Sequence, residues 1–372
     1  MHGSPAWVMG VPMRHNGLFI ALGGAALVAT AGVAVMLAPA RTGLPITLDP
    51  AADALSATGP RKPAHPRYTG VNIATGGFAS KHIPGRYGFD YFYPKPQETA
   101  PFVAAGMNAI RVPVLWERLQ PRPNAPIDAT ELARLDESIA GLGGFGLIIL
   151  DVHNYAKYRG QRLDQIDPRG AMLADLWTRL ARHYAGDKRI AFGVMNEPNG
   201  LSATAWRPIA EASLQAIRAT GARNLVLVPG TNWSGAHSWT KGSDSNGEAL
   251  KTLVDPANNM AFEMHQYPDA DSSGTHPECV SPKAAAQAFD SATAWLRANK
   301  ARGFLGEFGA SSDLNCLAAL DAVLGTLDAG SDVWLGWTYW AGGALWGPYM
   351  YSVQPDKTGD KPQMSILIRH KS

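Results

Sequence analysis

Short apolar runs alternate with longer amphipathic segments along the chain from residue 67 onward. The short runs are almost continuous in apolar residues and predict strands at 68–74, 108–114, 146–153, 190–196, 224–229, 260–265, 303–307 and 333–340. Between them, apolar residues recur at spacings of three and four, which predicts helices at 129–142, 171–184, 203–220, 282–301 and 314–329.

Strands that are apolar throughout are typical of a parallel sheet covered by helices on both faces. Eight strand–helix units over the length that remains after residue 67 predict a single (β/α)8 TIM barrel of the α/β class, rather than two smaller domains. The last unit is expected to be irregular or short, because residues 342–362 resemble a loop and only 364–369 could form a helix.

The first 40 residues differ from the rest of the chain. Arg14 and His15 precede a charge-free stretch, 17–40, that is rich in Ala, Gly, Leu and Val and ends in Ala38-Pro39-Ala40. This pattern predicts a signal peptide or a membrane anchor, because the ending suits cleavage while the apolar length suffices to span a bilayer. Residues 41–66 are expected to form a Pro/Ala-rich linker, and 67–372 the domain that contains the barrel. We therefore expect a secreted, periplasmic or cell-surface protein, with membrane attachment through 17–40 as one of the two alternatives.

Net charge and aromatic content limit the kind of partner. The formal net charge is only +2 and no long basic run occurs, so the pattern of a nucleic-acid-binding protein is missing. The chain has 11 Trp, 11 Tyr and 11 Phe, more than a core needs, although most of them are expected to be core residues. Sugar rings commonly stack on such side chains, which favours an uncharged carbohydrate partner.

Two cysteines, Cys279 and Cys316, are the only ones in the chain. In an exported protein an even pair favours a disulfide over a metal site, with free thiols as the alternative. The ten histidines show no zinc-ligand spacing, so no metal site and no cofactor are expected.

Polar side chains lie at or near the carboxyl ends of seven of the eight predicted strands. They are Asn72, Arg111, His153 with Asn154, Asn196 with Glu197, His265 with Tyr267, Glu307, and Trp340. The carboxyl ends of the strands carry the active site in TIM barrels, so these residues are the candidate site. Any one of them could instead be a structural polar group, but seven of eight strands ending this way favours function.

Two of these residues, Glu197 and Glu307, are carboxylic acids at the ends of different strands. Cleavage of a glycosidic bond needs one acid to protonate the leaving oxygen and one carboxylate on the other side of the sugar ring. The pair therefore predicts a glycosidase. A serine hydrolase has little support, because the chain contains no Gly-x-Ser-x-Gly motif.

Six motifs in this order resemble glycoside hydrolase family 5: NAIRVP at 108–113, LDVHNY at 150–155, MNEP at 195–198, HQY at 265–267, GEF at 306–308 and WTYW at 337–340. The resemblance spans about residues 67–369. Residues 229–237, and 265–279 up to Cys279, resemble the endo-β-1,4-glucanase (cellulase) branch of this family. That branch implies a disulfide between Cys279 and Cys316.

The resemblance also implies catalytic roles. Glu197 would be the acid/base and Glu307 the nucleophile of a retaining hydrolysis of β-1,4-glucan. Arg111 and Tyr267 would hold Glu307, and His265 would lie beside Glu197.

Substrate contacts are implied by the same resemblance. Asn196 would bind the sugar 2-hydroxyl, and His153 with Asn154 would bind other hydroxyls. Trp340 would form the floor under the reacting sugar, and Trp233 would lie under the leaving-group sugar. The sequence 73–78 departs from the usual cellulase pattern, which leaves the distal subsites on the non-reducing side undefined.

Two alternatives to a cellulase remain open at this stage. A β-mannanase or another β-glucan hydrolase would use the same barrel and the same two glutamates. A polysaccharide-binding protein without turnover would keep the barrel alone, which the full set of catalytic side chains disfavours.

Overall fold

The computed structural model describes residues 65–372, so the predicted signal or anchor segment, and the linker up to residue 64, lie outside the described residues. Within the described part, no helix is both long and apolar enough to cross a membrane.

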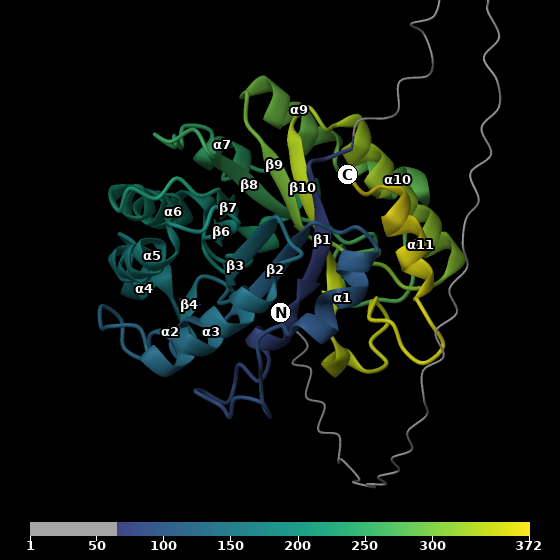
Figure 1. The fold of residues 1–372 in the computed structure, drawn as a ribbon. Helices are drawn as coiled ribbons and strands as arrows, with labels where there is room; N and C mark the ends of the chain where they lie inside the picture. The colour runs from purple at the N-terminus through teal and green to yellow at the C-terminus, as the bar shows by residue number, and fades with distance from the viewer. Residues whose placement is uncertain (1–64) are drawn as a thin grey trace, which may run out of the picture. The chain divides into compact units, whose positions relative to one another are not determined.

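Eight parallel strands close into a barrel (Figure 1). They are β1 (Tyr68–Ile73), β2 (Ala109–Val114), β3 (Leu147–Val152), β6 (Ile190–Gly193), β7 (Val226–Pro229), β8 (Met260–His265), β9 (Gly303–Glu307) and β10 (Trp334–Gly342). Their order around the barrel is β1-β10-β9-β8-β7-β6-β3-β2. The predicted (β/α)8 barrel is confirmed.

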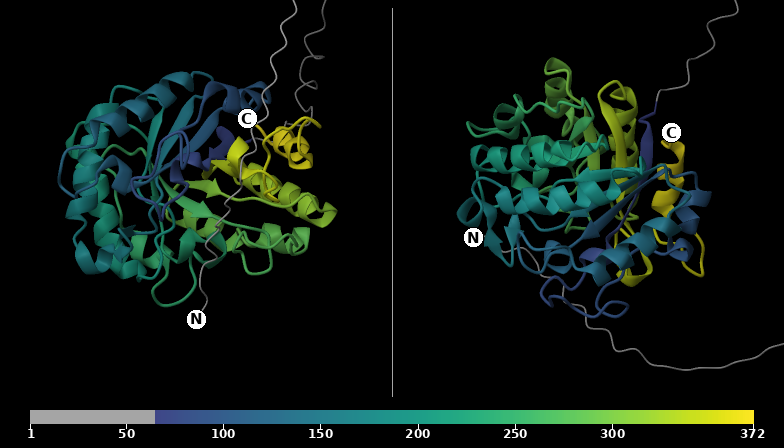
Figure 2. Two further views of the ribbon diagram at one scale, coloured as in Figure 1. Left: turned by 90° about the horizontal axis from the view of Figure 1, so that it is seen from below. Right: turned by 60° about the vertical axis from the view of Figure 1, so that its left-hand side comes forward.

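Helices lie around the strands, as the two views in Figure 2 show. The longer ones are α1 (Pro96–Ala104), α3 (Ala129–Gly141), α5 (Ala171–Tyr184), α6 (Ala203–Ala219), α9 (Asp290–Ala298), α10 (Leu314–Ala329) and α11 (Pro362–Arg369). Short pieces are α2 (Trp116–Leu119), α4 (Leu163–Ile166), α7 (Asn246–Leu250), α8 (Pro282–Gln287) and a hairpin of β4 (Lys157–Tyr158) with β5 (Gln161–Arg162). Side chains of Asp128, Ser202, Ser281 and Asp313 cap the helices that follow them.

Two predicted elements differ in the structure. The helix predicted at 282–301 is two helices, α8 and α9, because the chain turns at Ala288 and Phe289, where the fully buried Phe289 ring packs edge-on against Trp334. The strand predicted at 190–196 ends at Gly193. Asn196 and Glu197 therefore lie in the loop after β6.

The barrel interior changes from apolar to charged along its length. Ala109, Ile149 and Ala261 belong to an apolar cluster inside the barrel, separate from the core between strands and helices. A residue two positions further along a strand points to the same side. The next inward residues are Arg111, Asp151 and Glu263, all with no exposed surface. The charged half of the interior therefore lies towards the carboxyl ends of the strands.

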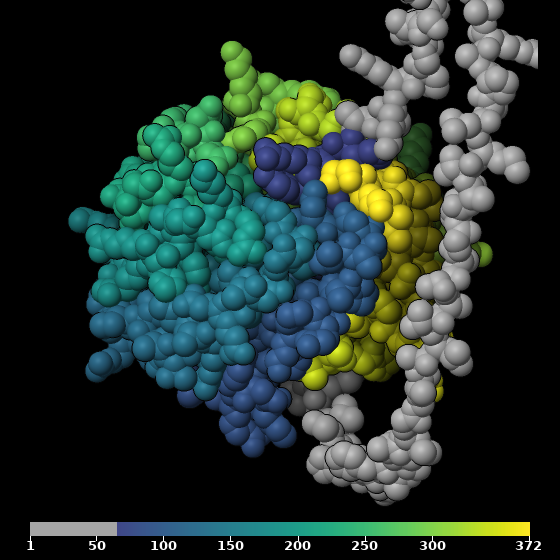
Figure 3. All heavy atoms as spheres, in the orientation of Figure 1, coloured from purple at the N-terminus to yellow at the C-terminus, as the bar shows by residue number. Residues whose placement is uncertain are grey.

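The two ends of the described chain meet at the opposite end of the barrel. Ser372 donates its backbone N–H to Thr69 Oγ1 at 3.4 Å, and Asn108 Nδ2 donates to Ser372 Oγ at 2.9 Å. In Figure 3 the yellow C-terminal residues lie against the purple start of the barrel. Elsewhere, Cys279 and Cys316 form a disulfide that joins the loop after β8 to the first turn of α10.

Candidate active site

Arg111, from β2, lies at the centre of the charged half of the barrel. Its guanidinium is buried and pairs with three carboxylates, at 2.9 Å from Glu263, 3.2 Å from Asp151 and 3.3 Å from Glu307. One guanidinium group thus forms ion pairs with three carboxylates. The prediction that Arg111 lies beside Glu307 agrees with this geometry, but Glu307 is its most distant carboxylate partner.

Two asparagines complete the surroundings of Arg111. Its Nη1 donates to Asn72 Oδ1 at 3.0 Å and its Nη2 donates to Asn196 Oδ1 at 2.8 Å. Asn72 in turn donates to the carbonyl of Gly306, next to Glu307, at 3.0 Å. These bonds fix the guanidinium plane and the end of β9 relative to each other.

Glu197 and Glu307 face each other across His265. His265 Nδ1 lies 2.8 Å from Glu197 Oε1 and 3.9 Å from Glu307 Oε2. One carboxylate oxygen of each glutamate and a ring nitrogen of His265 all lie within 4.8 Å of one another. Glu197 also has a left-handed backbone, with φ 41°, a strained conformation for a residue other than glycine.

The Glu307 carboxylate is buried and held at both oxygens. Tyr267 donates its hydroxyl to Oε1 at 2.6 Å, and Arg111 donates to Oε2 at 3.3 Å. The pKa of Glu307 lies above its ordinary value, mainly because the carboxyl group is buried. The positive charge of His265 lowers this pKa, the negative charge of Glu197 raises it, and the positive charge of Arg111 lowers it. The ionised form of Glu307 therefore depends on its two cationic neighbours.

His265 is a buried cation. Burial lowers the pKa of its imidazole, but the charge of Glu307 and the hydrogen bonds to Glu197 and Glu263 raise it to about 10. Its Nε2 lies 3.4 Å from Glu263 Oε1, so the ring links Glu263 to Glu197. A proton is thus held next to the Glu197 carboxylate.

Asn196 and His153 present polar groups beside the glutamates. Asn196 Nδ2 is buried and has no hydrogen-bond partner among the described residues, so it is a donor free for a ligand. His153 Nδ1 lies 2.7 Å from Asp151 Oδ2. Its ring stacks on Trp340, with ring centres 5.8 Å apart and an angle of 10° between the planes.

Aromatic rings continue from Trp340 into the loop after β10. Trp346 lies 5.6 Å from Trp340, and Tyr349 stacks on Trp346 at 4.5 Å between ring centres. Trp233, in the loop after β7, is half exposed and has a left-handed backbone with φ 54°. Aromatic side chains are therefore presented by two loops that follow barrel strands, the loops after β7 and β10.

Asn154 is the predicted site residue that the structure does not bring into this group. Its Oδ1 accepts from the backbone N–H of Trp116 at 2.9 Å, and its Nδ2 donates to Glu117 Oε2 at 2.7 Å. Both ends of the amide are used to hold the start of α2. Asn154 therefore supports the loop, and we do not include it among substrate contacts.

Asp151 and Glu263 are site residues that sequence reasoning missed. Each stands two positions before a predicted histidine on the same strand, His153 or His265, so the strand period of two could have identified them. Glu263 also explains Gly306, because a side chain at that position would collide with the Glu263 carboxylate.

Comparison with known proteins agrees with this arrangement. Residues 71–343 match the family described as Cellulase (glycosyl hydrolase family 5). Endoglucanase gh5-1 of Neurospora crassa is 37% identical over 294 residues, which cover 78% of this chain and 73% of that protein.

Solved structures are more similar still. XacCel5A, solved in complex with cellopentaose, is 48% identical with a TM-score of 0.80, covering 82% of this chain and 99% of that one. The endo-beta-1,4-glucanase Xac0029 from Xanthomonas axonopodis pv. citri is 46% identical with a TM-score of 0.79, covering 82% and 98%. The chain therefore belongs to the cellulase family, glycosyl hydrolase family 5, and is a glycoside hydrolase.

Proposed function

We propose that this protein is a retaining endo-β-1,4-glucanase that cleaves internal bonds of cellulose or a related soluble β-glucan. The observation that carries the mechanism is the separation of Glu197 and Glu307, which have carboxylate oxygens within 4.8 Å of each other. Retaining glycosidases hold their carboxyl groups about 5–5.5 Å apart, whereas inverting enzymes separate them by about 6.5–9.5 Å to admit a water molecule. The substrate class is supported by the relatives, which are named as endoglucanases or endo-β-1,4-glucanases.

In the first step, Glu307 attacks the anomeric carbon of the bound glucan. A glycosyl ester forms on Glu307 as the glycosidic C–O bond breaks, and the leaving oxygen takes a proton from Glu197. The product with the new hydroxyl then leaves. Because Tyr267 and Arg111 hold both oxygens of Glu307, the nucleophile is fixed in one orientation for this attack.

In the second step, a water molecule attacks the same anomeric carbon. Glu197, now ionised, takes a proton from the water as the ester bond to Glu307 breaks. The two inversions leave the β configuration unchanged.

The proton used by Glu197 is shared with His265. The two groups are joined by a 2.8 Å contact, so a proton on His265 is available to Glu197 as the leaving oxygen develops negative charge.

Asn196, His153 and Trp340 are the proposed contacts of the reacting sugar. The free Nδ2 of Asn196 suits a donor to the 2-hydroxyl, a contact that strengthens in the transition state. The stacked pair of His153 and Trp340 offers a polar edge beside an apolar ring face. Trp233, with 50% of its surface exposed, is the proposed platform for the leaving-group sugar.

Residues 1–40 are proposed to direct export, either as a cleaved signal or as a retained anchor, with 41–66 as linker and 67–372 as the catalytic domain. Glucan polymers of this class cannot enter a cell intact, so hydrolysis outside the cytoplasm fits the substrate.

The test is release of reducing ends by the full chain from carboxymethyl cellulose and from galactomannan in parallel, with Glu307→Ala as the blank. We expect cleavage of the cellulose derivative and its loss in the variant. Preference for mannan would overturn the substrate assignment and leave the mechanism standing. Activity on neither polymer would contradict the proposed endoglucanase.

A further inference from the structure

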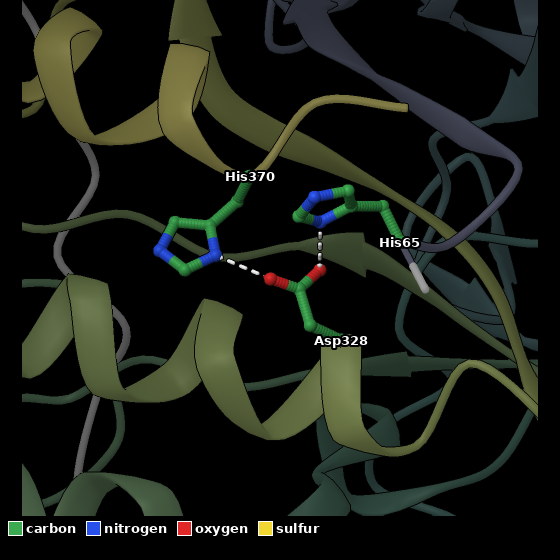
Figure 4. A group of neighbouring side chains, drawn as sticks. All are labelled: His65, Asp328 and His370. Carbon is green, nitrogen blue, oxygen red and sulfur yellow. Dashed lines mark hydrogen bonds and ion pairs between the residues drawn. The ribbon is translucent and has the colours of Figure 1, made fainter. Parts of the chain in front are cut away.

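Three side chains outside the active site converge at the other end of the barrel (Figure 4). His65 precedes β1, Asp328 lies in the last turn of α10, and His370 directly follows α11. His65 Nδ1 is 2.8 Å from Asp328 Oδ1, and His370 Nδ1 is 2.5 Å from Asp328 Oδ2. These residues lie up to 305 positions apart in the sequence, so no local spacing motif reveals them.

We propose that His65, Asp328 and His370 form a binding site for a divalent transition-metal ion, with zinc as the best match. A ring nitrogen of each histidine and a carboxylate oxygen of Asp328 lie within 4.8 Å of one another. Two imidazoles and one carboxylate are a donor set that suits zinc, with the fourth position open to water.

The fit requires little movement. Zinc lies about 2.0–2.2 Å from nitrogen and oxygen ligands, which places neighbouring donor atoms about 3–3.5 Å apart in a tetrahedral site. The distances from Asp328 to the ring nitrogens of His370 and His65, 2.5 and 2.8 Å, are shorter than this donor spacing by less than about 1 Å. The two imidazole rings are nearly perpendicular, at 86°, so their nitrogens can approach one ion from different directions.

A fourth residue supports the metal interpretation. Asp321 lies two turns before Asp328 on α10, and its Oδ1 is 2.9 Å from His370 Nε2. Histidines that bind metals commonly donate their other ring N–H to a carboxylate, which fixes the tautomer and increases the basicity of the ligating nitrogen. Arg369 pairs with Asp321 at 2.7 Å and holds that carboxylate in place.

Burial and position indicate a structural role for the ion. The side chains are 15%, 9% and 14% exposed for His65, Asp328 and His370, which leaves access for an ion but excludes a large ligand. The ion would join the residue before the first strand to the end of the last helix. We therefore expect it to stabilise the fold and to leave turnover at the opposite end of the barrel unchanged.

Calorimetric titration of the chelator-treated full chain with zinc chloride tests the site, together with thermal unfolding with and without zinc. The variants are His65→Asn and His370→Asn, because an asparagine amide can keep the hydrogen bond to Asp328 while being a poor zinc ligand. The control is His183→Asn, since His183 pairs with a single aspartate, Asp136, on the surface and belongs to no such three-residue cluster among residues 65–372.

We expect the unaltered protein and His183→Asn to bind one zinc ion per chain and to unfold at a higher temperature with zinc. We expect His65→Asn and His370→Asn to show neither zinc binding nor the rise in unfolding temperature. Zinc binding or stabilisation that persists unchanged in these two variants overturns the proposal. An unaltered protein that neither binds nor responds to zinc overturns it as well, and leaves a proton-bridged ion pair.

If the variants fail to fold, as circular dichroism would reveal, the cobalt form of the unaltered protein decides the matter. A visible spectrum of the intensity typical of four-coordinate cobalt supports the site. A spectrum like that of aqueous cobalt contradicts it.

Discussion

At the scale of single residues, the active site holds several buried carboxylates that share two positively charged side chains. Within the described residues, Arg111 is the one arginine that pairs with the buried carboxylates inside the barrel. It pairs with Asp151, Glu263 and Glu307 together. His265 supplies the second positive charge. Each ionised acid therefore affects the others, and substitutions here should change pH profiles as well as rates.

Replacing Arg111 with Gln tests this sharing. The charge of Arg111 lowers the pKa of Glu307, so its loss should raise that pKa and move the acidic limb of the kcat/KM profile to higher pH. We expect kcat to fall by about 10²–10³-fold, the loss typical of removing one preorganised charge contact. Arg297→Gln, at an exposed pair with Asp332, is the control. An acidic limb that does not move would contradict the role given to Arg111.

Replacing Glu263 with Gln tests the effect of the Glu263 carboxylate on His265. Glu263 raises the pKa of His265, so the variant should hold the shared proton less tightly, and the alkaline limb of the kcat profile should move to lower pH. A purely structural role for Glu263 predicts lower stability with an unshifted profile. Measurement of kcat across the pH range, alongside urea unfolding, separates the two.

At the scale of elements, most boundaries follow from the sequence and the remaining ones follow from packing. The bounds of β8, β9, α5 and α10 agree with the predicted ranges, because their apolar pattern begins and ends sharply. The break between α8 and α9 was not predicted, because the helical spacing of apolar residues runs on through Phe289 and does not reveal the turn at Ala288 and Phe289. Helix α1 was also missed, because Pro96 and Pro101 obscure its pattern although Pro96 begins it.

Arg218, in the last turn of α6, joins that helix to the loop before β8. It pairs with Asp255 at 2.7 Å, with side chains 6% and 3% exposed, and also donates to the carbonyls of Ala222, Asn224 and Asn259. We expect Arg218→Ala to lower the free energy of unfolding by about 3 kcal/mol, because a charge and several carbonyls lose their partner. Arg297→Ala, at an exposed pair of similar geometry, should cost less than about 1 kcal/mol.

The difference between these variants should depend on pH. Burial raises the pKa of Asp255, but Arg218 and backbone N–H groups lower it more, so the net shift is downward. The stabilisation is then present above the ordinary aspartate pKa of about 3.9 and is lost as pH falls through the lower folded value. Equal costs for the two arginines in urea unfolding at neutral pH would refute the importance of burial.

The disulfide joins the loop after β8 to α10 across 37 positions. Closing a loop of that length in the unfolded chain should stabilise the fold by about 4 kcal/mol. We expect urea unfolding of the double variant Cys279→Ala/Cys316→Ala to give a free energy of unfolding that is lower by that amount. Reductant should weaken the unaltered protein and leave the variant unchanged; a response of both would point to another cause.

At the scale of the whole molecule, the barrel separates two tasks. Glu197 and Glu307 lie at the carboxyl ends of the strands. At the opposite end of the barrel, the two ends of the described chain contact each other near His65 and His370. The barrel and its main site residues could be predicted from the sequence because strand ends converge in this fold. The histidine–aspartate cluster could not, because only the closed barrel brings residues 65, 328 and 370 together.

The most direct test of the account is capture of the covalent intermediate. An activated 2-deoxy-2-fluoro-β-cellobioside would be incubated with the full chain, followed by intact mass measurement and peptide mapping. The fluorine slows both steps, and the activated leaving group restores the rate of the first step only, so the ester should accumulate. We predict one added fluorocellobiosyl group per chain, located on Glu307 and absent in Glu307→Gln. A label on another residue, or turnover with inversion at the anomeric carbon and no label, would contradict the retaining mechanism.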